Sequence, residues 1–183
     1  MVFRIIYIPL IICNVITGAA QISFTREFTN KLNEAGAKIT IADDNWFKVT
    51  LCENDKLSYD LCVESPRDSA EMKYILYPDN NQSKILFPEV HFVSKIANIA
   101  VNDDTHWIRT KSFSQRIIED SLHADWAGEL SFYPKKTFTD KKYAKAFALY
   151  KQDYGMIYAI LYYNYEFLHF NEQLHSITFI KNF

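Results

Sequence analysis

Glycine is scarce in this chain. Only four of the 183 residues are glycine, at positions 18, 36, 128 and 155. Phosphate-binding loops need several glycines close together, because their backbone must turn tightly and approach the phosphates. The wide spacing excludes the Walker A loop and the dinucleotide-binding fingerprint, and with them most ATP-, GTP- and NAD-dependent enzymes. No other cofactor is indicated by the sequence.

The chain also lacks an excess of positive charge. It carries 20 basic and 22 acidic side chains, a formal net charge of −2, and no Lys/Arg run longer than a pair such as Lys135-Lys136. Proteins that bind nucleic acid need a basic surface to neutralise the phosphate backbone. We therefore expect no nucleic-acid partner.

Familiar nucleophile and metalloprotease motifs are missing as well. No serine lies in a G-x-S-x-G context, and the sequence contains no H-E-x-x-H. The sequence therefore favours a protein that is not an enzyme.

The first twenty residues resemble a secretory signal peptide. Arg4 supplies a positive start, residues 5–16 form an apolar stretch of twelve residues, and small residues precede a cleavage point after Ala20. The alternative is an uncleaved membrane anchor, since no charge occurs between Ile5 and Phe24. Pro9 makes a poor membrane helix, so we expect cleavage and an exported protein, periplasmic or secreted, that does not contact the membrane.

Two cysteines remain after cleavage, Cys52 and Cys62. An exported protein meets an oxidising environment, which favours a disulfide. The alternation of apolar residues predicts two strands, and a hairpin turning near residues 56–58 would place Cys52 opposite Cys62 and Leu51 opposite Val63. A redox or metal-binding pair is the alternative, but neither C-x-x-C nor a second thiol pair is present. We expect a structural disulfide.

Residues 21–183 are predicted to form one α+β domain, an antiparallel sheet (a meander with C-terminal hairpins) packed with about three helices. An antiparallel sheet is favoured because the strands come in adjacent runs and do not alternate with helices. The helices are expected at 22–35, 88–101 and from 113 onward, and the strands at 38–41, 46–52, 60–64, 71–77, 84–87, 129–133, 145–151, 156–163 and 174–180.

The C-terminal part is unusually aromatic. Between Tyr143 and Phe183 lie twelve aromatic residues, seven of them tyrosine. Both faces of the strand predicted at 156–163 are apolar, so both must be covered. One explanation is a sheet covered within its own domain, with tyrosine hydroxyls at the rim. The other is a partner-binding face, because tyrosine is enriched in protein interfaces; its candidate residues are Tyr154, Tyr158, Tyr162, Tyr163 and Tyr165.

One short segment contains residue types that can bind a cation or perform acid–base catalysis. Asp103, Asp104 and His106 place two carboxylates and an imidazole within four residues, which could hold a cation or perform acid–base catalysis. Asparagine and aspartate also end helices by local hydrogen bonding, and this explanation is favoured. His169 and His175 could form a pair, but zinc needs three or four ligands and no third is apparent. No metal site is predicted.

Small size, export, a disulfide, mild acidity and the aromatic C-terminal part together indicate a binding protein. We expect an exported inhibitor-type protein with a protein partner, such as a periplasmic immunity protein that neutralises a toxin or an enzyme. Two alternatives remain open. One is a small exported hydrolase or metal-dependent enzyme that uses the Asp/His segment, and the other is a secreted carrier of an apolar ligand.

Overall fold

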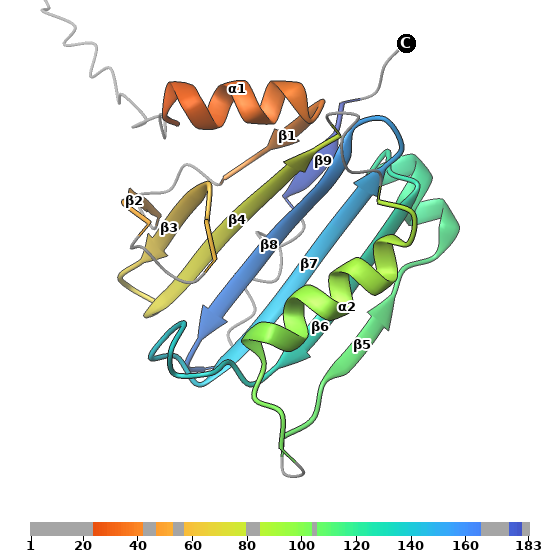
Figure 1. The fold of residues 1–183 in the computed structure, drawn as a ribbon. Helices are drawn as coiled ribbons and strands as arrows, with labels where there is room; N and C mark the ends of the chain where they lie inside the picture. Colours follow the sequence, from red (N-terminus) through yellow and green to blue (C-terminus); the bar gives the residue numbers. More distant parts are fainter. Residues whose placement is uncertain are drawn as a thin grey trace, which may run out of the picture.

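A seven-stranded antiparallel sheet forms the centre of the protein (Figure 1). The computed structural model describes residues 24–41, 47–52, 57–79, 85–103, 106–165 and 176–180. In spatial order the strands are β2 (Lys48–Thr50), β3 (Leu61–Ser65), β4 (Ala70–Pro78), β8 (Gly155–Tyr163), β7 (Tyr143–Lys151), β6 (Trp126–Phe132) and β5 (Arg109–Ser112). A separate two-stranded sheet pairs β1 (Ala37–Ile39) with β9 (Ile177–Phe179). The helices are α1 (Arg26–Glu34), α2 (Pro88–Ile99) and the π-helical turn η1 (Ile117–Ser121).

Strands β7 and β8 form the long central hairpin. Their register pairs Tyr150 with Met156 and Lys151 with Gly155. The turn uses positive φ angles at Asp153 and Gly155, of 67° and 107°. A Cβ atom at Gly155 would collide with the backbone carbonyl of Tyr77, so the close approach of β4 to this turn requires glycine.

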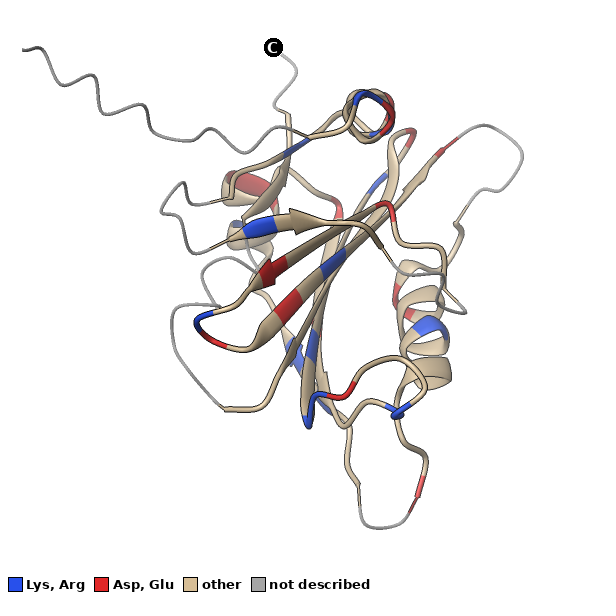
Figure 2. Cartoon of the chain, turned by 90° about the vertical axis from the view of Figure 1, so that its left-hand side faces the viewer, with Lys and Arg blue, Asp and Glu red and all other residues tan. Residues whose placement is uncertain are grey.

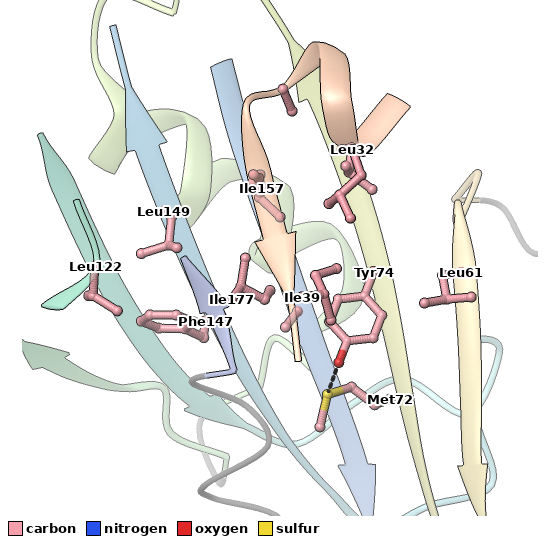
Figure 3. Close-up of a cluster of buried hydrophobic side chains, with 14 of the residues drawn as sticks. Leu32, Ile39, Leu61, Met72, Tyr74, Leu122, Phe147, Leu149, Ile157 and Ile177 are labelled. Atoms are coloured by element: carbon pink, nitrogen blue, oxygen red, sulfur yellow. Dashed lines mark hydrogen bonds between the residues drawn. The ribbon is translucent and has the colours of Figure 1, made fainter. Parts of the chain in front are cut away.

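One face of the large sheet is covered by α1, the β1–β9 pair and η1. Phe28 and Leu32 of α1 and Ile177 of β9 lie in one buried cluster with Phe147 and Ile157 of the sheet. Figure 3 shows part of this cluster, including the hydrogen bond that the Tyr74 hydroxyl donates to the Met72 sulfur. The small sheet is attached to its neighbours, because the Phe179 N–H donates to the Leu122 carbonyl at 3.0 Å.

Helix α2 covers the other face, over β6 and β7 (Figure 1). Phe92, Ile96 and Ile99 of α2 are buried in a second cluster with the β8 side chains Tyr158 and Ile160. All nine residues of β8 are buried. A strand covered on both faces by its own chain explains why 156–163 is apolar on both sides.

Local interactions define both ends of helix α1. The Thr25 hydroxyl accepts the Phe28 N–H at 3.2 Å, an N-cap that satisfies one of the free donors of the first turn. Gly36, with φ 56°, follows the last turn, and the ring of Tyr154 occupies the space that a Cβ atom would need there. The helix expected at 22–35 is thus present as α1.

The α+β class with antiparallel sheets is confirmed, and so are the β7–β8 hairpin and the disulfide between Cys52 and Cys62, whose Cα atoms lie 5.3 Å apart. The register of β2 and β3 differs from the prediction. Cys62 lies opposite Thr50 and Val63 opposite Val49, while Leu51 is almost fully exposed. A shift by two residues keeps every side chain on its face, so alternation alone does not determine the register.

Three elements were predicted incorrectly. The described part of the segment 84–87, residues 85–87, is not a strand but leads into α2. Residues 109–112 form the unexpected edge strand β5, and the helix expected from 113 is a short helical segment that contains the single π-turn η1. In α2, the buried side consists of Phe92, Ile96 and Ile99, and Val93 is exposed.

None of the helices in the described ranges combines the length and the apolar character needed to cross a membrane. Residues 1–23 lie outside the described residues, and the predicted signal peptide lies among them.

Candidate ligand-binding pocket

The pocket lies at the end of the large sheet where β4 finishes and the β7–β8 turn meets the start of α2. Its volume is about 620 Å³. Most of its walls are apolar, and they are formed by Leu76, Tyr77, Pro78, Ile85, Leu86, Phe87 and Val90. This volume lies within the range of cavities that hold small organic molecules.

The mouth of the pocket owes its shape to how α2 begins. Pro88 occupies the first turn of α2, a position where proline's missing N–H costs nothing. The preceding residue, Phe87, is the N-cap, and its side chain is exposed. Leu86, Phe87 and Val90 are between 65% and 75% exposed, and all three border the opening. Three large apolar side chains at the mouth of one pocket are unusual for a surface that only meets water.

One polar residue of the wall, His91, is paired with the buried Tyr158 behind it. His91 Nδ1 lies 2.5 Å from the Tyr158 hydroxyl, and His91 itself lines the pocket. The Tyr158 side chain is fully buried, and its hydroxyl also lies 3.1 Å from the Met156 sulfur. The Tyr77 ring contacts both His91 and Tyr158 edge to face. These contacts fix the imidazole against the sheet.

The environment keeps both members of this pair neutral near pH 7. Burial lowers the pKa of His91, and the nearby Lys95 ammonium lowers it further. Burial raises the pKa of Tyr158 far above its ordinary value. A neutral imidazole and a neutral phenol can form a hydrogen bond, one as donor and the other as acceptor, without burying a charge.

An ion pair ties α1 to the sheet beside the pocket. Lys31, which lines the pocket, places its ammonium 2.6 Å from one Asp60 oxygen, and the other Asp60 oxygen accepts the Leu76 N–H at 2.7 Å. The hydrogen bond that the Lys31 ammonium donates to Asp60 raises the pKa of Lys31. One carboxylate thus holds α1 and β4 together.

The five tyrosines predicted to bind a partner lie in different environments. Tyr158, Tyr162 and Tyr163 are buried within the fold, so their rings contact this chain itself. Tyr154 is half-buried and lies against Phe179. Only Tyr165 stands mostly in solvent. Among these five tyrosines, Tyr165 therefore exposes the most side-chain surface to a partner.

The predicted Asp/His segment forms a local loop contact. Asp103 accepts the backbone N–H of His106 at 2.9 Å and lies 2.6 Å from the His106 ring, which packs on Tyr133. Asp104 lies outside the described residues. The contact between Asp103 and His106 is the turn chemistry that the sequence offers as the alternative to a site. Within the described ranges, no three His, Cys, Asp or Glu side chains gather as a metal site would require.

His123 is not among the residues that line the pocket. His123 follows η1 with φ 52°, and its ring Nδ1 lies 3.1 Å from the Glu119 carbonyl. His169 and His175 lie outside the described residues.

A second, smaller hollow of about 220 Å³ lies by the other edge of the sheet. Trp107 and Arg109 border it, with the guanidinium 4.7 Å above the indole ring. Elsewhere acidic and basic residues are mixed along the described chain, as Figure 2 shows. The larger pocket remains the site with the clearest binding chemistry.

No family model, curated protein or solved structure matches this chain. The sequence offered no local signal for the pocket. Its polar pair, His91 and Tyr158, is separated by 67 residues and comes together only when α2 packs on β8.

Proposed function

We propose that this chain is an exported binding protein that carries a small, largely apolar molecule in the pocket at the start of α2. The observation that supports this most is a cavity of about 620 Å³ with apolar walls, bordered by the exposed side chains of Leu86, Phe87 and Val90. A ligand seated there would cover apolar surface that otherwise meets water. The helix and strands around it are anchored in the two buried clusters, which gives the site a rigid frame.

Export is part of the proposal. The signal-like pattern of the first twenty residues supports it, and so does the disulfide between Cys52 and Cys62, because such bonds persist in oxidising compartments. Intact mass of the protein from culture medium or periplasm tests it: cleavage after Ala20 leaves a chain that begins at Gln21. Recovery of uncleaved protein from the cytoplasm alone would contradict it.

The binding proposal is tested with a fluorescent apolar probe, N-phenyl-1-naphthylamine, whose emission rises in an apolar site. We expect saturable binding by the mature protein. Val90→Lys places a charge at the mouth of the pocket and should weaken binding about ten-fold or more, since burying an unpaired ammonium is costly. Val93→Lys is the matched control, because Val93 is exposed on the same helix and does not line the pocket. Equal loss or equal retention in the two variants would refute the assignment.

A protein partner is the second candidate, in line with the inhibitor-type function expected from the sequence. The observation that favours it is the group of exposed apolar residues Leu86, Phe87 and Val90, since such patches commonly mark interfaces. A partner could insert a side chain into the same pocket. Tagged mature protein and its Val93→Lys variant should then recover one stoichiometric partner, and the Val90→Lys variant should lose it. Recovery by all three would place the interface elsewhere.

A further inference from the structure

The pocket is mostly apolar, and its polar lining residues are His91, Lys31, Asp79, Ser94 and Tyr150. Lys95 lies outside the lining, one helical turn after His91. We infer that the ligand is an apolar molecule with a single terminal carboxylate, and that His91 Nε2–H and the Lys95 ammonium hold this carboxylate. The inference rests on the proposed function and adds the chemical class of the ligand. The apolar body would lie along Leu76, Ile85 and Phe87.

The proton on His91 follows from the hydrogen bonds of Tyr158. The Tyr158 hydroxyl has one hydrogen and two neighbours that could accept it, His91 Nδ1 at 2.5 Å and the Met156 sulfur at 3.1 Å. An imidazole nitrogen is a much stronger acceptor than a thioether sulfur, so the hydroxyl donates to Nδ1. The hydrogen of the neutral imidazole is therefore on Nε2. His91 presents a donor to the pocket, and a donor selects an acceptor.

Charge around His91 favours an anionic acceptor over a neutral one. Lys95 lies one helical turn after His91, and its ammonium is 5.1 Å from the centre of the Tyr77 ring that lines the pocket. The same Tyr77 ring contacts His91 edge to face, so Lys95 and His91 both lie against one residue of the lining. Lys31 is already paired with Asp60, and Asp79, the acidic residue of the lining, directly follows β4.

His91 and Lys95 together favour a ligand group that is negatively charged and accepts hydrogen bonds. A carboxylate beside His91 would gain a charge-assisted hydrogen bond from Nε2–H and the attraction of Lys95, whereas an alcohol would gain only an ordinary hydrogen bond. An amine would present donors to a donor and a positive charge to Lys95. The order of affinity for chains of equal length should be carboxylate, then alcohol, then amine.

The test is isothermal titration calorimetry with octanoate, octanol and octylamine at pH 7.5. We expect octanoate to bind roughly ten-fold or more tightly than octanol, the range that charged hydrogen bonds give. Lys95→Met should reduce the octanoate affinity and leave the octanol affinity unchanged. His91→Phe should reduce the octanoate affinity more than the octanol affinity, because octanol loses only an ordinary hydrogen bond. Lys136→Met, which removes an exposed lysine from a segment that contributes no residue to the lining, is the control.

The outcomes separate the two proposals. If octanoate and octanol bind equally well, and Val90→Lys abolishes both, the carboxylate inference is wrong and the apolar binding site remains. Tighter binding of octylamine than of octanoate also overturns the inference. If none of the three compounds binds at millimolar concentration, and the fluorescent probe does not bind either, the proposed function fails and the inference fails with it.

Discussion

The disulfide between Cys52 and Cys62 joins residues ten positions apart, so its contribution to stability can be worked out from the loop it closes. The loop-closure relation gives an entropy loss for the unfolded chain of about 9 cal/mol/K, or about 2.7 kcal/mol at 25 °C. The double variant Cys52→Ser/Cys62→Ser removes this constraint and leaves two small polar side chains. We expect its free energy of unfolding to fall by about 2–3 kcal/mol.

Urea unfolding followed by tryptophan fluorescence measures this loss. With an m-value of about 2 kcal/mol/M, the midpoint should fall by about 1.3 M. Oxidised and reduced wild-type protein should differ by a similar amount, and the double variant should not respond to reducing agent. Equal midpoints for the oxidised wild type and the double variant would refute the reasoning, because they would show that the cross-link does not restrict the unfolded chain.

Three further predictions concern packing, an ion pair and pH. Phe147→Ala, in the middle of β7 and fully buried, should destabilise the protein by about 3–5 kcal/mol in the same urea assay. Asp60→Ala removes the acceptor of both Lys31 and the Leu76 N–H and should cost about 2–3 kcal/mol, whereas Lys31→Met should cost at most about 1 kcal/mol because Lys31 is partly exposed; equal costs would contradict the role given to Asp60. Burial and Lys95 lower the pKa of His91 in the folded protein, so on acidification the unfolded chain takes up the proton first. The contribution of His91 to the free energy of unfolding should therefore be constant above about pH 6.5, and stability should fall as the pH drops from about 6.5 toward the lowered pKa. Urea midpoints from pH 5 to 8 measure this, and a His91→Phe variant with the same pH slope as the wild type would disprove it.

The parts of the fold that the sequence predicts best are those with strong local signals. Helix α1 has a capping Thr25, apolar residues at Phe28 and Leu32, and Gly36 after its last turn. The β7–β8 hairpin has two long apolar strands around a turn that ends in Gly155. In both cases the local preferences and the packing agree, so the pattern is sufficient.

Elements without an apolar face escaped prediction. All four residues of β5 are exposed, and it is a strand only because its backbone pairs with β6. The sequence there, Arg-Thr-Lys-Ser, contains no alternation to detect. In the helical segment that follows, the Gln115 side chain donates to Glu119.

The candidate site depends on contacts between distant parts of the chain. The sequence correctly indicates that both faces of β8 need a cover, but it does not reveal that α2 supplies one of them. From the sequence alone, Tyr158 is therefore equally suited to a partner-binding surface or to the core. Only the packing of α2 brings His91 to its hydroxyl and leaves Phe87 and Val90 at the mouth of a pocket.

Backbone amide chemical-shift mapping during an octanoate titration tests the assignment of the pocket most directly. The account predicts saturable shifts confined to the amides around the pocket, foremost Phe87, Val90, His91 and Gly155. Shifts centred instead on Arg109 and the other hollow, or no shifts at millimolar octanoate, would contradict it.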